Sequence, residues 1–310
     1  MKLSELYSKN TQCPKKPAKN PIISIEIFPP KAPKGASYEK EFALKKEQLF
    51  CELAALNKIL KPSLVSITYG AAGSNSEKSD EIIRNMLEKF DYSAIMPHFT
   101  CVCSKKEFIE RYLNSLKTYG IQNILALKGD EPEDLENIGG VCYRDFHYAS
   151  DLVEFIKAKT DFEIAVAGYP EGHIAAESLE EDVKHLKTKV QKGGSVIFTQ
   201  FFFENDKFYR YLELLDKNSI NLPVVAGLLP VISYEGLMRM IRLSGIKPSA
   251  KVLNTFEKYK DSKEDIIKAG IELTSIQADD LIKNGVLGLH FYTLNKARST
   301  SEVLKNICLC

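Results

Sequence analysis

The stretch IISIEIFPP, residues 22–30, reads as a buried strand that contains a single acid. Its isoleucines favour extended structure, and Pro29–Pro30 ends the run because proline donates no hydrogen bond to a sheet. Glu26 lies in the middle of this run. A buried carboxylate is costly unless it is paired or neutralised, so the residue calls for a structural or a chemical reason.

Similar apolar runs recur along the chain, separated by longer amphipathic stretches. Between two of them, Leu179, Val183, Leu186 and Val190 form one apolar face over residues 179–193, which predicts a helix. The predicted strands are 22–30, 64–70, 94–100, 123–129, 163–170, 195–203, 223–230 and 286–294.

Eight strands with helical crossovers and a last helix near 297–307 predict an α/β fold in which helices cover parallel strands. We predict a single (β/α)₈ TIM barrel, with an open doubly wound sheet as the alternative. The long gap at 231–285 predicts an extra helical insertion before the last strand. We expect residues 1–20 to form an N-terminal arm and 21–310 to form one catalytic barrel domain.

The balance of charges argues against binding to nucleic acids or anionic membranes through net charge. The chain has 310 residues, 44% of them hydrophobic, with 42 basic and 41 acidic side chains. A net charge of +1 gives no reason to expect nucleic-acid or anionic-membrane binding. No apolar run approaches the roughly 20 residues that span a bilayer, and the polar start lacks a signal peptide. We therefore expect a soluble cytoplasmic protein.

The seven cysteines and the absent motifs narrow the chemistry further. An odd cysteine count without a secreted context predicts free thiols. The two C-x-C pairs do not have the spacing of zinc knuckles, so we predict no metal site. The chain has no G-x-G-x-x-G or phosphate-loop motif, so any nucleotide cofactor binds without a Rossmann fingerprint. It also lacks the H-E-x-x-H and G-x-S-x-G motifs of zinc proteases and serine hydrolases.

Polar side chains gather at the predicted strand ends, where parallel barrels place their active sites. One such residue alone has an ordinary explanation: an Asp caps a helix, a His is structural, and Gln200 faces outward. Together they predict a wide polar and aromatic pocket suited to a large planar ligand. These residues are Glu26, Thr68, Tyr69, His98, Thr100, Lys128, Asp130, Tyr169, Glu171, His173, Gln200, Tyr292, Thr293, Asn295 and Lys296.

The ordered blocks SIEIFPP, VSITYGA, PHFTC, ILALKGD, YASDLV, VAGYPEGH, TQFFF, GLLPV and HFYTLN resemble the methylenetetrahydrofolate reductase family. The resemblance covers about residues 22–300 and is closest to the short bacterial type, without a C-terminal regulatory domain. It implies a barrel that binds FAD, which NADH or NADPH reduces before 5,10-methylenetetrahydrofolate enters the same place. The product would be 5-methyltetrahydrofolate for methionine synthesis.

The resemblance assigns Glu26 as the general acid that protonates the departing nitrogen when the folate ring opens. At its ordinary pKa near 4.3 the side chain would be ionised at pH 7, so the acid needs a raised pKa. We expect the neighbouring isoleucines and Phe28 to raise the pKa by excluding water. The alternative is a structural ion pair between Glu26 and a cation such as Lys128.

Other roles also follow from the resemblance. Asp130 would act near the flavin pyrimidine and the folate pterin, and Gln200 and Lys296 would contact substrate. Asp182 and Lys189 are seven residues apart and so share one helical face, with the lysine suited to a pyrophosphate. The implied cofactor contacts are Thr68, Tyr69, Ala71, His98, Lys128, Gly129, Asp130, Tyr148, Ala149, Tyr169, His173, Ala176, Asp182, His185 and Lys189.

The sequence departs from the family pattern at several of these positions. Lys128 and Lys296 stand where the family usually has Arg, which replaces a planar bidentate fork with a point charge. Further departures are His185, Thr188, Gly236 and Met240.

Two other functions remain open from sequence. One is a barrel flavoenzyme reduced by a partner subunit, and the other is a non-redox folate-binding or methyl-transfer accessory protein. The combination of Glu26, Asp130 and Gln200 favours the reductase. The choice between NADH and NADPH is also left open, and we expect a homo-oligomer.

Overall fold

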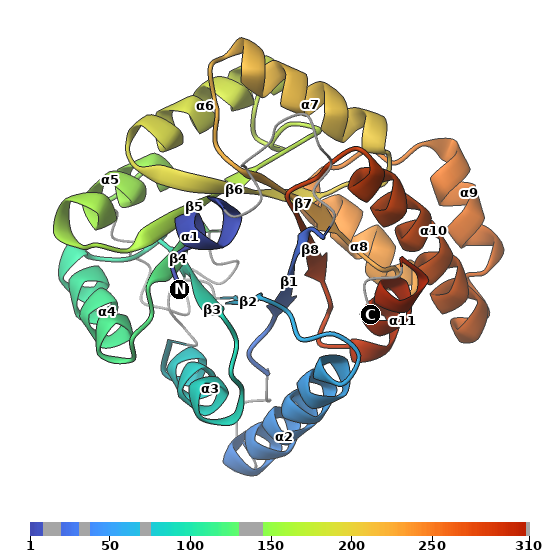
Figure 1. Cartoon of the computed structure of the whole chain (residues 1–310), viewed down its shortest axis with the longest axis horizontal. Coiled ribbons are helices and arrows are strands. Elements are labelled where there is room, and N and C mark those ends of the chain that lie inside the picture. The colour runs from blue at the N-terminus through green and yellow to red at the C-terminus, as the bar shows by residue number, and fades with distance from the viewer. Residues whose placement is uncertain (9–19, 31–37, 69–75, 130–144, 308–310) are drawn as a thin grey trace.

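The computed structural model of the protein describes residues 1–8, 20–30, 38–68, 76–129 and 145–307. Eight strands follow one another around a closed barrel, ringed by helices (Figure 1). The strands are β1 Ile22–Ile27, β2 Leu64–Ile67, β3 Ala94–Thr100, β4 Asn123–Leu127, β5 Glu163–Gly168, β6 Gly194–Phe201, β7 Val224–Leu228 and β8 Gly288–Tyr292.

All eight strand pairs are parallel, and the β1–β8 pair closes the barrel. In that pair Ser24 lies opposite His290 and Glu26 lies opposite Tyr292. The predicted TIM barrel is therefore confirmed, and the open doubly wound sheet is excluded. Strand β3 has the predicted bounds, whereas the other strands end two or three residues earlier than predicted; β7, for example, ends at Leu228, just before Leu229 and Pro230.

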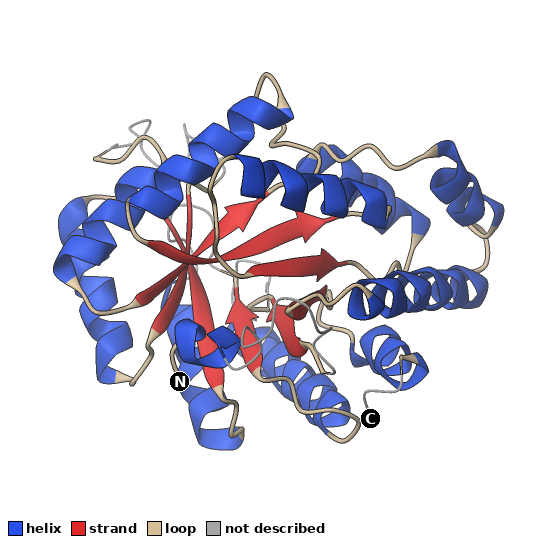
Figure 2. Ribbon diagram, turned by 45° about the horizontal axis from the view of Figure 1, so that its top comes forward, coloured by secondary structure: helices blue, strands red, loops and turns tan. Residues whose placement is uncertain are grey.

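The helices form the outer layer of the barrel (Figure 2). Between β7 and β8 lie three helices instead of one, which confirms the predicted insertion. Ser233, Ser249 and Ser262 cap the amino ends of these three helices with their hydroxyls. The described helices are α1 Leu3–Ser8, α2 Tyr38–Asn57, α3 Ser76–Lys89, α4 Lys106–Thr118, α5 Ala149–Lys159, α6 Leu179–Gln191, α7 Asn205–Lys217, α8 Tyr234–Ser244, α9 Ala250–Lys258, α10 Lys263–Lys283 and α11 Ala297–Asn306.

Alternating strand residues divide the core into two layers. Outward residues such as Ile25 and Ile27 join helix side chains in the larger cluster. Inward residues such as Met96 and Phe198 form a separate cluster inside the barrel. The barrel interior is thus packed rather than open, as in other barrels of this type.

Helix α1 closes the end of the barrel where the strands begin (Figure 1). Leu3 and Tyr7 are fully buried there, and the Tyr7 ring meets Phe198 edge-on at 6.2 Å between centroids. The Leu3 amide donates to Asn123 Oδ1 over 3.0 Å, at the first residue of β4. The first part of the predicted arm is therefore a helix docked on the barrel floor.

Two further expectations concern membranes and cysteines. Among the described helices, none combines the length and the apolar character needed to cross a bilayer. Cys51 and Cys101 carry free thiols, as predicted. Cys103 is disulfide-bonded, so the expectation of free thiols is wrong for that residue.

Candidate active site

Glu26 points into the barrel, not toward the helices. Its neighbours Ile25 and Ile27 belong to the outer cluster with the side chains of α2, and strand side chains alternate. Ser24, which shares the face of Glu26, lies 2.9 Å from His290 Nδ1 on the neighbouring strand. The acid therefore lines the interior near the carboxyl end of β1.

Burial changes the protonation of Glu26. The residue is 6% exposed, and desolvation raises its pKa to about 8, so it is largely neutral at pH 7. The direction of the shift and its cause, burial away from water, agree with the prediction, but the side chains expected to provide that burial differ. The isoleucines face the helices, and the strand neighbours of Glu26 are Ser66 and Tyr292.

His98 on β3 is the ionisable group that meets Glu26. Its Nε2 lies 3.5 Å from Glu26 Oε2, and burial lowers the pKa of His98 to about 3. Both groups are therefore neutral near pH 7, and the contact joins a carboxylic acid to a neutral imidazole. Lys128 is exposed and forms no ion pair with the residues that the structure describes, so it does not neutralise Glu26.

Thr293 and Asn295, which follow β8, bind the backbone at the acid and just after it. Thr293 Oγ1 donates to the Glu26 carbonyl over 2.7 Å. Asn295 makes two bonds to Phe28, accepting from its amide and donating to its carbonyl, each at 2.8 Å. Asn295 has φ +58°, a conformation that asparagine tolerates better than most residues. The end of β1 is thus tied to β8 through side chains.

A second group of predicted residues meets at the end of β5 and on α6. The rings of Tyr169 and His173 are perpendicular, with centroids 4.7 Å apart. Lys189 Nζ lies 5.8 Å from the Tyr169 centroid and donates to the Ala167 carbonyl over 2.7 Å. The structure therefore brings together an aromatic pair and an ammonium at one edge of the barrel.

Asp182 and Lys189 share a face of α6, as their spacing predicts, and both are affected by burial. Desolvation raises the pKa of Asp182, although Lys189 and His173 oppose the shift. Desolvation also lowers the pKa of Lys189 to about 8, against the attraction of Asp182. His185 and Thr188 are exposed on the same helix.

Gln200 lies partly exposed at the end of β6, where its Oε1 accepts from the Phe201 amide over 3.1 Å. Beside it, Tyr292 on β8 donates its hydroxyl to the Thr199 carbonyl over 2.9 Å. This hydrogen bond between β8 and β6 depends on Gly227, which lies between the two residues. A Cβ at position 227 would lie 2.3 Å from the Thr199 carbonyl oxygen and 2.9 Å from the Tyr292 ring.

The end of β4 depends on a glycine. Gly129 has φ +84°, and a Cβ there would lie 2.7 Å from Thr100 Cβ. Cys101 Sγ donates to the carbonyls of Lys128 and Tyr148, at 3.6 and 3.8 Å. Tyr148 itself is 64% exposed. The predicted residues Lys128, Gly129 and Tyr148 are therefore neighbours around Cys101.

The remaining predicted residues differ in placement. Thr68 follows β2 and is partly exposed, Ala149 begins α5, and the Ala176 amide donates to the His173 carbonyl over 2.9 Å. Lys296 is exposed and pairs with Glu52 of α2 at 3.1 Å, so it joins neither group. Three predicted residues lie outside the described parts of the chain: Tyr69, Ala71 and Asp130.

The sequence did not single out His290 on β8. This residue is 1% exposed, and burial lowers its pKa to about 3, with His98 contributing. Its ring lies 5.3 Å from that of Tyr292, centroid to centroid. The alternation of side chains along a strand could have identified it, because His290 and Tyr292 are two residues apart in one strand and therefore share its inner face.

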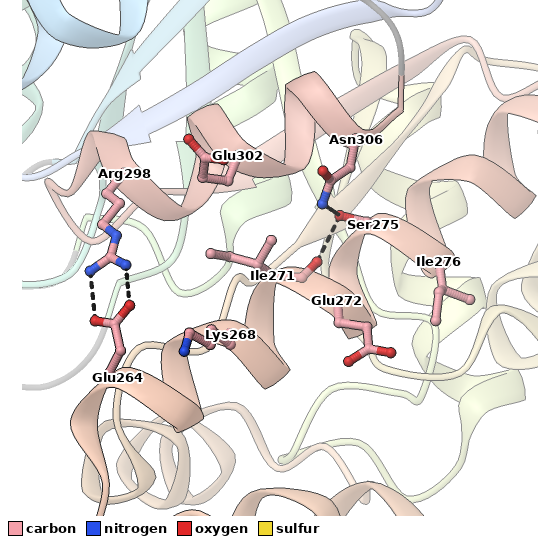
Figure 3. A pocket seen from close by; sticks show the side chains of 9 residues that line it. All are labelled: Glu264, Lys268, Ile271, Glu272, Ser275, Ile276, Arg298, Glu302 and Asn306. Atoms are coloured by element: carbon pink, nitrogen blue, oxygen red, sulfur yellow. Dashed lines mark hydrogen bonds and ion pairs between the residues drawn. The ribbon is translucent and has the colours of Figure 1, made fainter.

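A cleft of about 590 Å³ lies elsewhere, between α10 and α11 on the outer layer (Figure 3). Arg298 and Glu264 form a bidentate ion pair at one end of it, and Asn306 bonds Ser275 at 3.0 Å at the other. Seven of its nine lining residues are polar or charged, and none of the predicted site residues contributes to it. The candidate active site is therefore the barrel mouth, by which we mean the end of the barrel where the strands end.

Comparison with protein families gives one match that covers almost the whole chain. The family model described as methylenetetrahydrofolate reductase matches residues 11–308. Methylenetetrahydrofolate reductase 1 of Schizosaccharomyces pombe is 32% identical over 288 residues, covering 92% of this chain and 46% of the relative. The chain thus spans about half the length of this relative.

A bacterial relative matches over nearly its full length. The 5,10-methylenetetrahydrofolate reductase of Buchnera aphidicola subsp. Acyrthosiphon pisum is 34% identical over 293 residues, covering 92% of this chain and 90% of the relative. A solved structure of an uncharacterized Clostridium thermocellum protein, which binds two copies of 5-methyl-5,6,7,8-tetrahydrofolic acid, aligns with a TM-score of 0.63. At 12% identity, over 98% of this chain and 97% of that one, this likeness shows the fold alone.

Proposed function

Because the chain belongs to the methylenetetrahydrofolate reductase family, we propose that it reduces 5,10-methylenetetrahydrofolate to 5-methyltetrahydrofolate with FAD as cofactor and NADH or NADPH as electron donor. The two substrates take turns at one site in a ping-pong order. The product feeds methionine synthesis in the cytoplasm. The carrying observation is a buried, neutral Glu26 at the mouth of the barrel.

The inner wall of β2 and β3 suits the polar edge of a flavin. Three buried polar atoms there lack a hydrogen-bond partner among the described residues: Ser66 Oγ, His98 Nε2 and Thr100 Oγ1. Buried polar atoms are usually satisfied, so unpaired ones in a row are typical of a wall that binds a polar ligand. Gly129 next to Thr100 allows a close approach of backbone.

The group of residues that follows β5 and lies on α6 suits the pyrophosphate, ribose and adenine of the cofactor. Lys189 would hold the pyrophosphate as a point charge, and Asp182 would accept from a ribose hydroxyl or an adenine amine. Tyr169 and His173 offer an aromatic surface beside that charge. Held by these residues, FAD would supply the hydride-transfer chemistry that links the nicotinamide to the folate.

Glu26 supplies the proton that the folate step requires. The imidazolidine ring opens only when its departing nitrogen is protonated, which calls for an acid that is still neutral at pH 7. Glu26 meets this condition, because burial raises its pKa to about 8. Gln200, partly exposed at the end of β6, would orient whichever substrate is bound. Asp130 and Lys296 remain predicted contacts.

Anaerobic half-reactions test the proposal. Purified protein should be yellow, NADH or NADPH should bleach it, and methylenetetrahydrofolate should restore the colour with formation of the methyl product. Stopped-flow traces with both nicotinamides would also rank them. A colourless protein that stays empty in excess FAD would support the accessory function instead. A flavin reduced by dithionite but by neither nicotinamide would support a partner subunit as the donor.

A further inference from the structure

Glu26 and His98 form an isolated pair inside the barrel. They lie on β1 and β3, alternate strands that contribute to the same interior layer. Each is 6% exposed, and their facing atoms are 3.5 Å apart. Within the described residues, His98 Nε2 has no hydrogen-bond partner, and no lysine or arginine pairs with Glu26. Among the described residues, the imidazole is thus the one basic side chain paired with the acid, and Tyr292, the register partner of Glu26 on β8, is the other titratable neighbour.

The surrounding titratable groups do not compete for this role. From β8, His290 engages Ser24 through Nδ1, and Tyr292 engages the Thr199 carbonyl through its hydroxyl. Tyr169, the residue after β5, influences Tyr292 electrostatically, and Glu26 does so as well. Burial keeps both histidines neutral and raises the pKa of Tyr292. The acidic proton near neutral pH therefore belongs to the carboxyl of Glu26.

We propose that His98 is the positioning residue of the catalytic acid: its Nε2 accepts a hydrogen bond from the protonated Glu26 carboxyl, which keeps its proton and is held neutral and oriented toward the mouth. This role rests on the proposed function, and because it occupies Nε2, the flavin contact expected of His98 would fall to the rest of the ring. A hydrogen bond to the protonated form stabilises the neutral acid, whereas an imidazolium would favour the carboxylate and remove the acid.

Infrared spectroscopy of the full-length flavin-loaded protein tests the pairing without any folate. A protonated carboxyl gives a carbonyl band of its own, and loss of that band in Glu26→Gln assigns it. In His98→Leu the band should move to higher frequency, because the carboxyl has lost its acceptor. His98→Gln, which keeps an acceptor, should restore most of the original position. His147→Leu changes an exposed histidine and is the matched control.

Kinetics of the folate step test the consequence. The His98→Leu change should slow this step about tenfold, the effect of one hydrogen bond, and His98→Gln should recover most of the loss. The pH above which the rate falls should move down in the Leu variant. In a Glu26→Gln background the Leu change should cost nothing further, because His98 acts through Glu26.

The outcomes separate this role from the proposed function. An unmoved band in His98→Leu, or a rate loss that adds fully to that of Glu26→Gln, overturns the positioning role. A band that shifts as described in a protein that reduces no folate supports the pairing and overturns the proposed function. A shift in His147→Leu as large as that in His98→Leu would point to a general change of structure and also overturn the role.

Discussion

The two ends of the barrel are built from the same eight strands, yet they carry opposite kinds of side chains. At the floor, apolar residues such as Met96 and Phe198 meet the plug formed by Leu3 and Tyr7 of α1. The mouth instead holds acids and bases whose pKa values are shifted by burial, Glu26, His98, Asp182 and Lys189, whereas the shifted group at the floor is the phenol of Tyr7. Shifted groups collected in one place are typical of functional sites.

The floor of the barrel therefore contributes mainly to the stability of the fold, and the mouth is the end proposed to carry out the reaction. The floor buries large side chains that contribute to folding, and Asn123 there both accepts from Leu3 and donates to the Met1 carbonyl. The mouth leaves Ser66, His98 and Thr100 with unpaired buried atoms in one cluster, which costs folding free energy, whereas at the floor Tyr7 and Glu163 each leave one such atom. Changes at the mouth should therefore alter activity, and changes at the floor should alter stability.

The largest expected effect is the loss of the folate step in Glu26→Gln. General acid catalysis contributes roughly 10²–10⁴-fold, so the rate of this step should fall by about that factor. Reduction of the flavin by NADH needs no such proton and should change little. Stopped-flow measurement of both half-reactions checks the difference.

Glu163→Gln at the floor is the matched control, because it changes a carboxyl on the first residue of β5, beside α1. It should leave both half-reactions within about twofold. If Glu26→Gln slowed both half-reactions equally, Glu26 would not be the general acid of the folate step.

The next effect is a stability loss at the floor. Tyr7 is fully buried, so Tyr7→Ala should reduce the free energy of unfolding by about 3–5 kcal/mol, the cost of removing a buried ring. The rates of both half-reactions should stay near wild type in the protein that remains folded. Urea unfolding measures the loss, with the exposed Leu44→Ala as a control expected to stay within about 0.5 kcal/mol.

A smaller effect should follow pH at the mouth. Folding raises the pKa of Glu26 from 4.5 to about 8, so the folded state binds the proton more tightly. Stability from this group is complete below pH 4.5 and falls as pH rises toward 8. Glu26→Gln has no proton to lose and should gain about 2–4 kcal/mol over wild type between those limits.

Urea unfolding of both proteins from pH 5 to 9 measures this difference. His98 and His290 titrate in both proteins, so their acid-side contributions largely cancel in the comparison. A difference that stays constant with pH would show that Glu26 is already ionised in the folded protein.

The contrast between the ends was only partly predictable from sequence. Strand order, the insertion at 231–285 and the polar strand ends follow from local periodicity, and the structure agrees with them. The environment of Glu26 did not follow, because alternation sends its sequence neighbours Ile25 and Ile27 to the other face. His98, its real neighbour, is 72 residues away in sequence.

Other surprises have the same origin. Lys296, a predicted substrate contact that follows the last strand, pairs with Glu52 from a helix far away in the chain, a partner that the sequence did not indicate. The floor helix α1 was hidden because a six-residue segment shows too few turns for a clear apolar period. Contacts between distant segments decide these cases, and no local pattern encodes them.

The smallest expected effect concerns the cofactor end of the mouth. In Lys189→Met the ammonium proposed to meet the pyrophosphate is lost, which should weaken FAD binding about 10–100-fold. The pKa of Lys189 lies near 8, so wild-type affinity should also fall as pH rises through that value, where the ammonium loses its charge. Flavin titration of the apoprotein measures both effects, with Lys187→Met on the same helix as control. If Lys189→Met bound FAD as tightly as wild type, Lys189 would not contribute to the cofactor site, and only the residues around Glu26 would remain as the functional part of the mouth.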